Sequence, residues 1–108
     1  MSQTIVILLR FREKDAEGFK NLFRVNILPM WEEFKTAGKF IGASLSPVVD
    51  GNDVQDGMRD YILHVEVPSD KEHDEFDSQP MFQAFLEKVR PLQPEKPRVW
   101  IGETRFQV

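Results

Sequence analysis

The segment that most constrains the fold is residues 4–11, which reads Thr-Ile-Val-Ile-Leu-Leu-Arg-Phe. β-Branched and aromatic residues of this kind favour β-strands. Because successive side chains of a strand point to opposite faces, this strand is apolar on both sides and needs cover on both. Helices of the same chain can cover one face, so the other face predicts a partner. The two apolar sets are Ile5, Ile7, Leu9 and Phe11 on one side and Val6 and Leu8 on the other.

The composition predicts one domain that spans residues 1–108. Compact domains cluster near this length, and the 41% hydrophobic content, with nine Phe, is enough to fill one core. No cysteine is present, which fits a reducing compartment. The first apolar run is too short to span a bilayer and follows no basic segment, so we expect a cytoplasmic protein without a membrane anchor. The net charge of −4 argues against nucleic acid as a partner.

Apolar residues at spacings of three and four predict the first helical region. Asp15 is expected to be its N-cap, and the apolar stripe runs from Phe19 to Phe34. Pro29 lacks an amide hydrogen and crowds the preceding turn, so the helix should kink or restart there. Gly38 should end it, because glycine readily adopts the left-handed conformation at the C′ position.

The remainder of the chain predicts three strands and a second helix. Residues 40–49 and 59–67 alternate as strands, and the Asp- and Gly-rich segment between them predicts a hairpin with a long loop. Residues 71–76 are expected to form a short turn, and Ser78 to cap the helix that carries Met81, Phe82, Phe85, Leu86 and Val89. Three prolines then lead to a last strand beginning at Val99.

The order β, α, β, β, α, β predicts the ferredoxin-like α+β fold, a four-stranded antiparallel sheet with both helices on one face. The first and third strands usually lie in the middle of such a sheet. The helix-free face should then be too apolar to face water, which predicts a homodimer that packs sheet against sheet. Trp100 fits equally well in the core or in that contact. The helix-free face would carry Val6, Leu8, Ile62, His64 and Glu66.

Residues 77–92, Asp-Ser-Gln-Pro-Met-Phe-Gln-Ala-Phe-Leu-Glu-Lys-Val-Arg-Pro-Leu, together with the element order, resemble the dimeric α/β-barrel superfamily. That superfamily includes antibiotic-biosynthesis monooxygenases and haem-degrading monooxygenases. The resemblance implies a ligand held between helices and sheet in each subunit. The haem-degrading branch has an Asn on its first strand, a Trp on its third and a His in its second helix. This chain lacks all three, with Leu86 at the His position, so haem degradation is disfavoured. Other members of the superfamily oxidise an electron-rich aromatic molecule without a cofactor, and the resemblance implies this chemistry as a candidate for the chain.

The candidate site combines an apolar pocket with one proton acceptor, and neither a metal nor a cofactor is expected. His64 is the candidate catalytic base, although a histidine beside Glu66 at a dimer interface is an alternative. His73 lies in a run of charged residues around the predicted turn, which we interpret as a solvated charged face and not as a metal site. A non-catalytic association or ligand-sequestering protein is the alternative function, and a cavity on the order of 300 Å³ touched by Tyr61 or His64 would argue against it. The ligand-binding candidates are Phe23, Trp31, Tyr61, Phe82 and Phe85.

Overall fold

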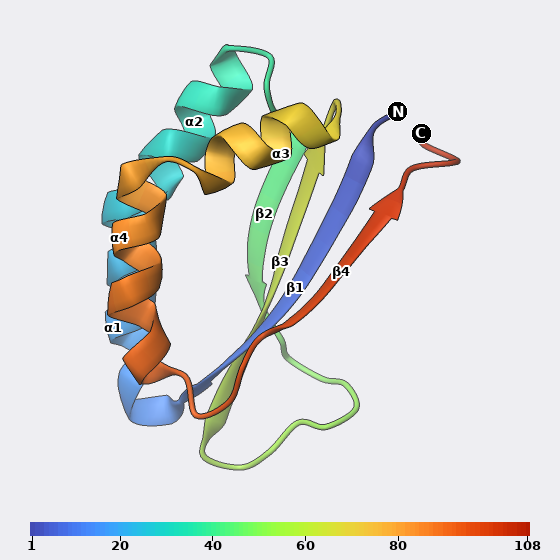
Figure 1. The fold of residues 1–108 in the computed structure, drawn as a ribbon. Coiled ribbons are helices and arrows are strands. Elements are labelled where there is room, and N and C mark those ends of the chain that lie inside the picture. Colours follow the sequence, from blue (N-terminus) through green and yellow to red (C-terminus); the bar gives the residue numbers. More distant parts are fainter.

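The computed structural model describes all 108 residues and confirms the ferredoxin-like α+β fold. Each of the two predicted helical regions is divided into two helices (Figure 1). In chain order the elements are β1 (Gln3–Arg12), α1 (Glu13–Asn26), α2 (Leu28–Thr36), β2 (Gly42–Pro47), β3 (Met58–Val67), α3 (Asp70–Asp77), α4 (Pro80–Val89), the 3₁₀ helix η1 (Arg90–Leu92) and β4 (Arg98–Glu103).

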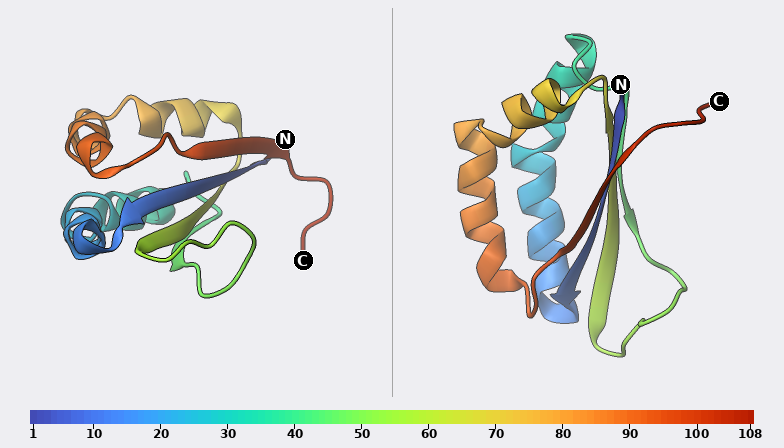
Figure 2. Two further views of the ribbon diagram at one scale, coloured as in Figure 1. Left: turned by 90° about the horizontal axis from the view of Figure 1, so that it is seen from below. Right: turned by 45° about the vertical axis from the view of Figure 1, so that its right-hand side comes forward.

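The four strands form one antiparallel sheet in the order β2-β3-β1-β4, so β1 and β3 are central as predicted. Ile5 pairs with Val65 and Leu9 pairs with Tyr61 across the β1–β3 ladder. This register places the apolar alternate positions of both strands on the same face. The helices lie on that face, while the β2–β3 loop and the C-terminal residues extend on the other side (Figure 2).

The core lies between the sheet and the helices and is dominated by phenylalanine. The rings of Phe11 and Phe19 stack with centroids 4.1 Å apart, and both residues are fully buried. Burial of this amount of apolar surface is the main favourable term in folding. This burial depends on residues from every α-helix, from the two central strands and from the segment before β2. The clustered residues are Ile5, Leu9, Phe11, Phe19, Phe23, Ile27, Met30, Trp31, Phe34, Phe40, Tyr61, Val65, Val67, Phe76, Phe85 and Val89.

The break predicted at Pro29 is confirmed. Ile27 separates α1 from α2, and Pro29 lies in the first turn of α2. Amides in the first turn have no acceptor within the helix, so the missing amide hydrogen of Pro29 costs no hydrogen bond. Gly38 has a φ of 76° just past the end of α2, and the amides of Gly38 and Lys39 donate to the carbonyls of Lys35 and Phe34. These two bonds form a Schellman motif, which satisfies the last carbonyls of the helix.

Three predicted boundaries are corrected. Asp15 is not the N-cap of α1, because the helix begins at Glu13 directly after β1, and the Glu13 amide donates to the Gly57 carbonyl. Residues 71–76 belong to a complete helix, α3, whose Phe76 packs into the core. Ser78 caps the end of α3, and Gln79 precedes α4, because the chain must turn between these two helices.

A buried ion cluster lies on the helix-free face where β1 approaches its end. Arg10 is 8% exposed, and its guanidinium makes a two-bond contact with Asp60, with Nε–Oδ1 at 2.8 Å and Nη2–Oδ2 at 2.9 Å. Nη2 also donates to the Asp53 carbonyl at 2.6 Å, and Nη1 donates to Glu95 at 3.3 Å. Arg10 therefore joins the two central strands to the β2–β3 loop and to the proline-rich connection before β4.

The rest of the helix-free face carries a row of apolar side chains that no helix covers. Ile62 is 41% exposed and Trp100 is 56% exposed, so Trp100 is not a core residue. Trp100 pairs with Val6 across the β1–β4 ladder, and Ile62 pairs with Leu8 across the β1–β3 ladder. No helix of the protein has the length and apolar character that a bilayer crossing would require.

Candidate functional site

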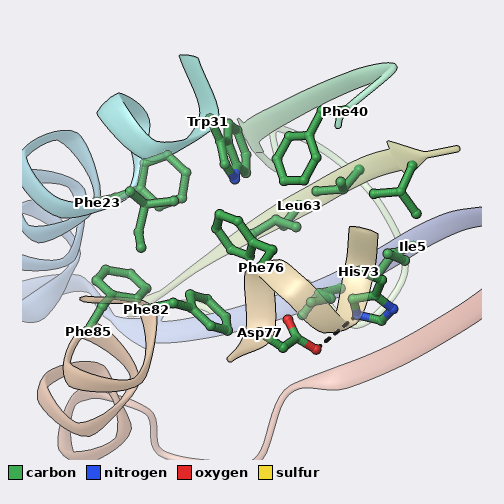
Figure 3. Close-up of a pocket in the computed structure, with 14 residues that line it drawn as sticks. Ile5, Phe23, Trp31, Phe40, Leu63, His73, Phe76, Asp77, Phe82 and Phe85 are labelled. Carbon is green, nitrogen blue, oxygen red and sulfur yellow. Dashed lines mark ion pairs between the residues drawn. The ribbon is translucent and has the colours of Figure 1, made fainter. Parts of the chain in front are cut away.

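An apolar cavity lies between the sheet and the helices, in the middle of the core (Figure 3). Twelve of its fourteen lining residues are hydrophobic. The space that the centre of a water molecule can reach is about 70 Å³, which is smaller than the roughly 300–1,000 Å³ of common ligand pockets. A ligand of more than a few heavy atoms therefore requires side chains of the lining to move. The lining consists of Ile5, Ile7, Phe23, Ile27, Trp31, Phe40, Leu63, Val65, Val67, His73, Phe76, Asp77, Phe82 and Phe85.

Aromatic side chains from four helices form most of the wall opposite the sheet. The rings of Phe23 and Trp31 meet edge to face, with centroids 4.9 Å apart, and Phe23 meets Phe85 in the same way at 6.2 Å. Phe76 and Phe82 approach to 4.8 Å. Edge-to-face and offset contacts of this kind leave ring faces available to a flat guest, because aromatic rings also stack on other π systems.

The cavity contains one polar pair, His73 and Asp77 of α3. The two residues are one turn apart and share a face of the helix, and His73 Nε2 lies 3.1 Å from Asp77 Oδ2. Figure 3 shows the carboxylate turned toward the imidazole at the side of the cavity nearest Ile5. Partial burial raises the pKa of Asp77, the neighbouring Asp74 raises it further, and His73 lowers it.

Four of the six predicted site residues line this cavity. Phe23 and Trp31 come from α1 and α2, and Phe82 and Phe85 come from α4. They converge because the apolar stripes of these helices all face the sheet. Trp31 is thus both a core residue, 7% exposed, and a wall of the cavity.

Tyr61 does not line the cavity, which corrects its placement among the ligand-binding candidates. Its ring lies in the filled part of the core, 5.2 Å from Phe19 and 6.0 Å from Phe11 between centroids. The reason is its position on β3, four residues from Val65 toward the other end of the sheet. Tyr61 therefore acts as a packing residue beside the cavity.

His64 lies on the opposite face of the sheet from the cavity, so it cannot reach a ligand held there. It pairs with Val6 and Ser44 across the sheet, and its Nε2 lies 3.8 Å from Glu66 Oε1. The side chain of His64 is 40% exposed. Neither Tyr61 nor His64 lines this cavity, so the condition that would argue against the non-catalytic protein is not met there. Any proton transfer by His64 on its own face of the sheet stays a prediction.

Sequence reasoning missed His73 and Asp77 because they lie in a segment dense with charge. A usable signal was present, since His73, Phe76 and Asp77 have the spacing of one helix face and Phe76 is apolar. An amphipathic helix over residues 70–77 would place all three toward the core. No group of three or more His, Cys, Asp or Glu side chains converges as a metal-binding set.

Comparison with known proteins gives structural neighbours only. No family model and no curated protein matches the sequence. Rv0793 from Mycobacterium tuberculosis superposes with a TM-score of 0.78 at 14% identity, over 99% of this chain and 98% of that one. A proposed antibiotic biosynthesis monooxygenase from Nitrosomonas europaea superposes with a TM-score of 0.75 at 12% identity, over 95% of this chain and 89% of that one. A second proposed antibiotic biosynthesis monooxygenase, from Caulobacter crescentus, superposes with a TM-score of 0.74 at 14% identity, over 97% of this chain and 91% of that one. Likeness at these identities establishes the fold.

Proposed function

We propose, from the ferredoxin-like fold that this chain shares with antibiotic biosynthesis monooxygenase-like proteins of the dimeric α/β-barrel superfamily, that it is a small-molecule-binding homodimer. Each subunit would take a compact, largely apolar or aromatic molecule between its helices and its sheet. The observation that carries the proposal is the aromatic-walled cavity with a single polar pair, because apolar sites with a few placed polar groups are typical ligand sites.

The chemistry that fits this cavity is oxidation of an electron-rich aromatic by dioxygen, without a cofactor. Removal of a proton from an activated methylene group leaves a carbanion, which supplies electrons to dioxygen. One oxygen atom then becomes the new carbonyl of the substrate, and the other leaves as water with the two hydrogens of the methylene group. An apolar wall suits this chemistry, because it excludes bulk water that would return the proton to the carbanion.

A second candidate function is supported by the small volume of the cavity. With only about 70 Å³ of accessible space, the aromatic side chains already contact one another closely. A protein built for association or for holding a small apolar molecule, without turnover, fits that packing equally well. Fold alone does not choose between the two functions.

The homodimer is proposed to form through the helix-free sheet face. Val6, Leu8, Ile62 and Trp100 form a continuous apolar row there by their strand pairing, and Ile62 and Trp100 are 41% and 56% exposed. Burying such a row against a second copy removes it from water. Sedimentation at micromolar concentration tests this, and a single 12.6 kDa species contradicts it.

Oxygen uptake with a panel of anthrone-like and quinol substrates tests the enzymatic function. Leu63→Phe fills the cavity and should abolish turnover, whereas Val25→Phe adds the same ring at a position that is 71% exposed and outside the cavity, so it should have no effect. Binding of these molecules without oxygen uptake favours the sequestering protein. Absence of both binding and uptake contradicts the small-molecule function altogether.

A further inference from the structure

The polar pair of α3 lies at the edge of the cavity, where the His73 side chain is 21% exposed and the Asp77 side chain is 49% exposed. The lining residues contributed by β1, β3, α1, α2 and α4 and by the segment before β2 are all hydrophobic, so His73 and Asp77 are the only groups in the cavity that can exchange a proton. Asp74 on the same helix also acts on Asp77 and raises its pKa. A ligand in this cavity therefore meets one acid–base group and otherwise hydrocarbon.

The backbone of α3 holds the pair toward the sheet. The helix begins after Pro68, where the Ser69 hydroxyl donates to the Glu72 carboxylate in its first turn. At the other end, Phe76 is buried against Phe34 and Phe40, with centroids 5.2 and 5.3 Å away. Because His73 and Asp77 share the helix face of Phe76, the packing of that ring fixes the direction of both polar side chains.

The geometry points to His73 as the proton acceptor of the proposed ligand site and to Asp77 as the residue that positions it. This inference rests on the proposed small-molecule function and narrows the ligand to compact aromatic molecules with an acidic hydroxyl or activated C–H group. A carboxylate 3.1 Å from Nε2 favours the imidazole tautomer with its hydrogen on Nε2. That tautomer leaves the lone pair of Nδ1 as the site that accepts.

The proton step is balanced within the complex. The ligand O–H or C–H bond breaks, its electron pair stays on the ligand as an oxyanion or carbanion, and the proton forms the N–H bond of an imidazolium. The Asp77 carboxylate stabilises the new positive charge, and the imidazolium in turn stabilises the ligand anion. Water partly screens the attraction to Asp77, whose side chain is 49% exposed. The attraction between the imidazolium and a ligand anion inside the apolar cavity is stronger than in water, because the local dielectric constant is lower there.

The test uses 4-nitrophenol as probe, because its ionised form absorbs visible light and its neutral form does not. Nitrobenzene, which lacks the hydroxyl group, serves as the matched ligand. Wild-type protein should bind both and should lower the apparent pKa of bound 4-nitrophenol by about one unit, the size of shift that one nearby opposite charge produces. The readout is the absorbance of the bound phenolate between pH 5 and 8.

Two histidine variants receive the same substitution. His73→Leu should still bind nitrobenzene but should no longer raise the ionised fraction of 4-nitrophenol. His64→Leu removes the other histidine, which lies on the opposite face of the sheet, and a shift that persists in this variant assigns the proton to His73. His73→Asn, which stays polar but cannot take up the proton, should behave as His73→Leu and guards against a folding defect in the latter. Asp77→Asn should reduce the shift, and Asp77→Glu should restore part of it.

The outcomes separate this inference from the proposed function. Equal ionisation of 4-nitrophenol in wild type and in both His73 variants, with nitrobenzene bound by all, overturns the role of His73 and leaves the ligand site standing. If His64→Leu no longer lowers the pKa of bound 4-nitrophenol, the role of His73 is likewise overturned and the ligand site still stands. If wild-type protein binds neither nitrobenzene nor 4-nitrophenol, the small-molecule function fails and the inference fails with it.

Discussion

Replacement of Arg10 by methionine should destabilise the fold strongly. The guanidinium is 8% exposed and the Asp60 side chain 7% exposed, and the two are joined by hydrogen bonds of 2.8 and 2.9 Å. Arg10→Met leaves Asp60 as a buried carboxylate without its counter-charge, and breaking a buried pair in this way costs about 3–5 kcal/mol. The hydrogen bond to Asp60 also raises the pKa of Arg10, so the guanidinium stays charged in the folded protein.

Urea unfolding at one fixed protein concentration measures this cost. With a denaturant slope of about 2 kcal/mol per molar, the midpoint should fall by roughly 1.5–2.5 M. Arg59→Met is the matched control: Arg59 is the neighbouring arginine of β3, its partner Glu13 is exposed, and exposed pairs contribute less than about 1 kcal/mol.

A double-mutant cycle identifies the physical origin of the loss. Arg10→Met combined with Asp60→Leu removes both charges, so the double variant should be more stable than Arg10→Met alone. The reasoning is refuted if Arg10→Met costs less than about 1 kcal/mol, or if the two substitutions destabilise additively. Additivity would mean that the unpaired Asp60 carboxylate is not what destabilises the single variant.

Four further outcomes are expected. Phe19→Ala, at a fully buried ring, should lower the free energy of unfolding by about 3–5 kcal/mol in urea titrations. Gly38→Ala should lower the free energy of unfolding by about 1 kcal/mol, because φ is 76° at this position and an alanine backbone is strained there. The added methyl group meets no neighbouring atom, so backbone strain is the whole cost, and an unchanged melting temperature would contradict it. Ile62→Glu should shift sedimentation toward monomer while leaving the circular dichroism spectrum unchanged, and an intact dimer would exclude this face. Because burial raises the pKa of Asp77 above its ordinary 3.8, the stability that this group contributes is present below pH 3.8 and is lost as pH rises through the raised folded-state pKa. Asp77→Asn should therefore gain stability relative to wild type as pH rises above 3.8 in thermal melts, and parallel curves would contradict the shift.

The sequence by itself determined the order of the elements, the central place of β1 and the break at Pro29. These depend on local rules: side-chain alternation in strands, apolar spacing in helices, and the backbone restrictions of proline and glycine. The same alternation places His64 on the face away from Leu63 and Val65. Its exclusion from the cavity could therefore have been read from the strand pattern alone.

Only the tertiary structure decided which side chains share the cavity. Tyr61 and Leu63 follow the same face of β3, yet one is packed by Phe11 and Phe19 and the other borders open space. The difference depends on where helices cross the sheet, which no local pattern specifies. His73 and Asp77 reach the cavity because Phe76 anchors α3 in one rotation about its axis, and that rotation is set by packing against α2 and the chain before β2.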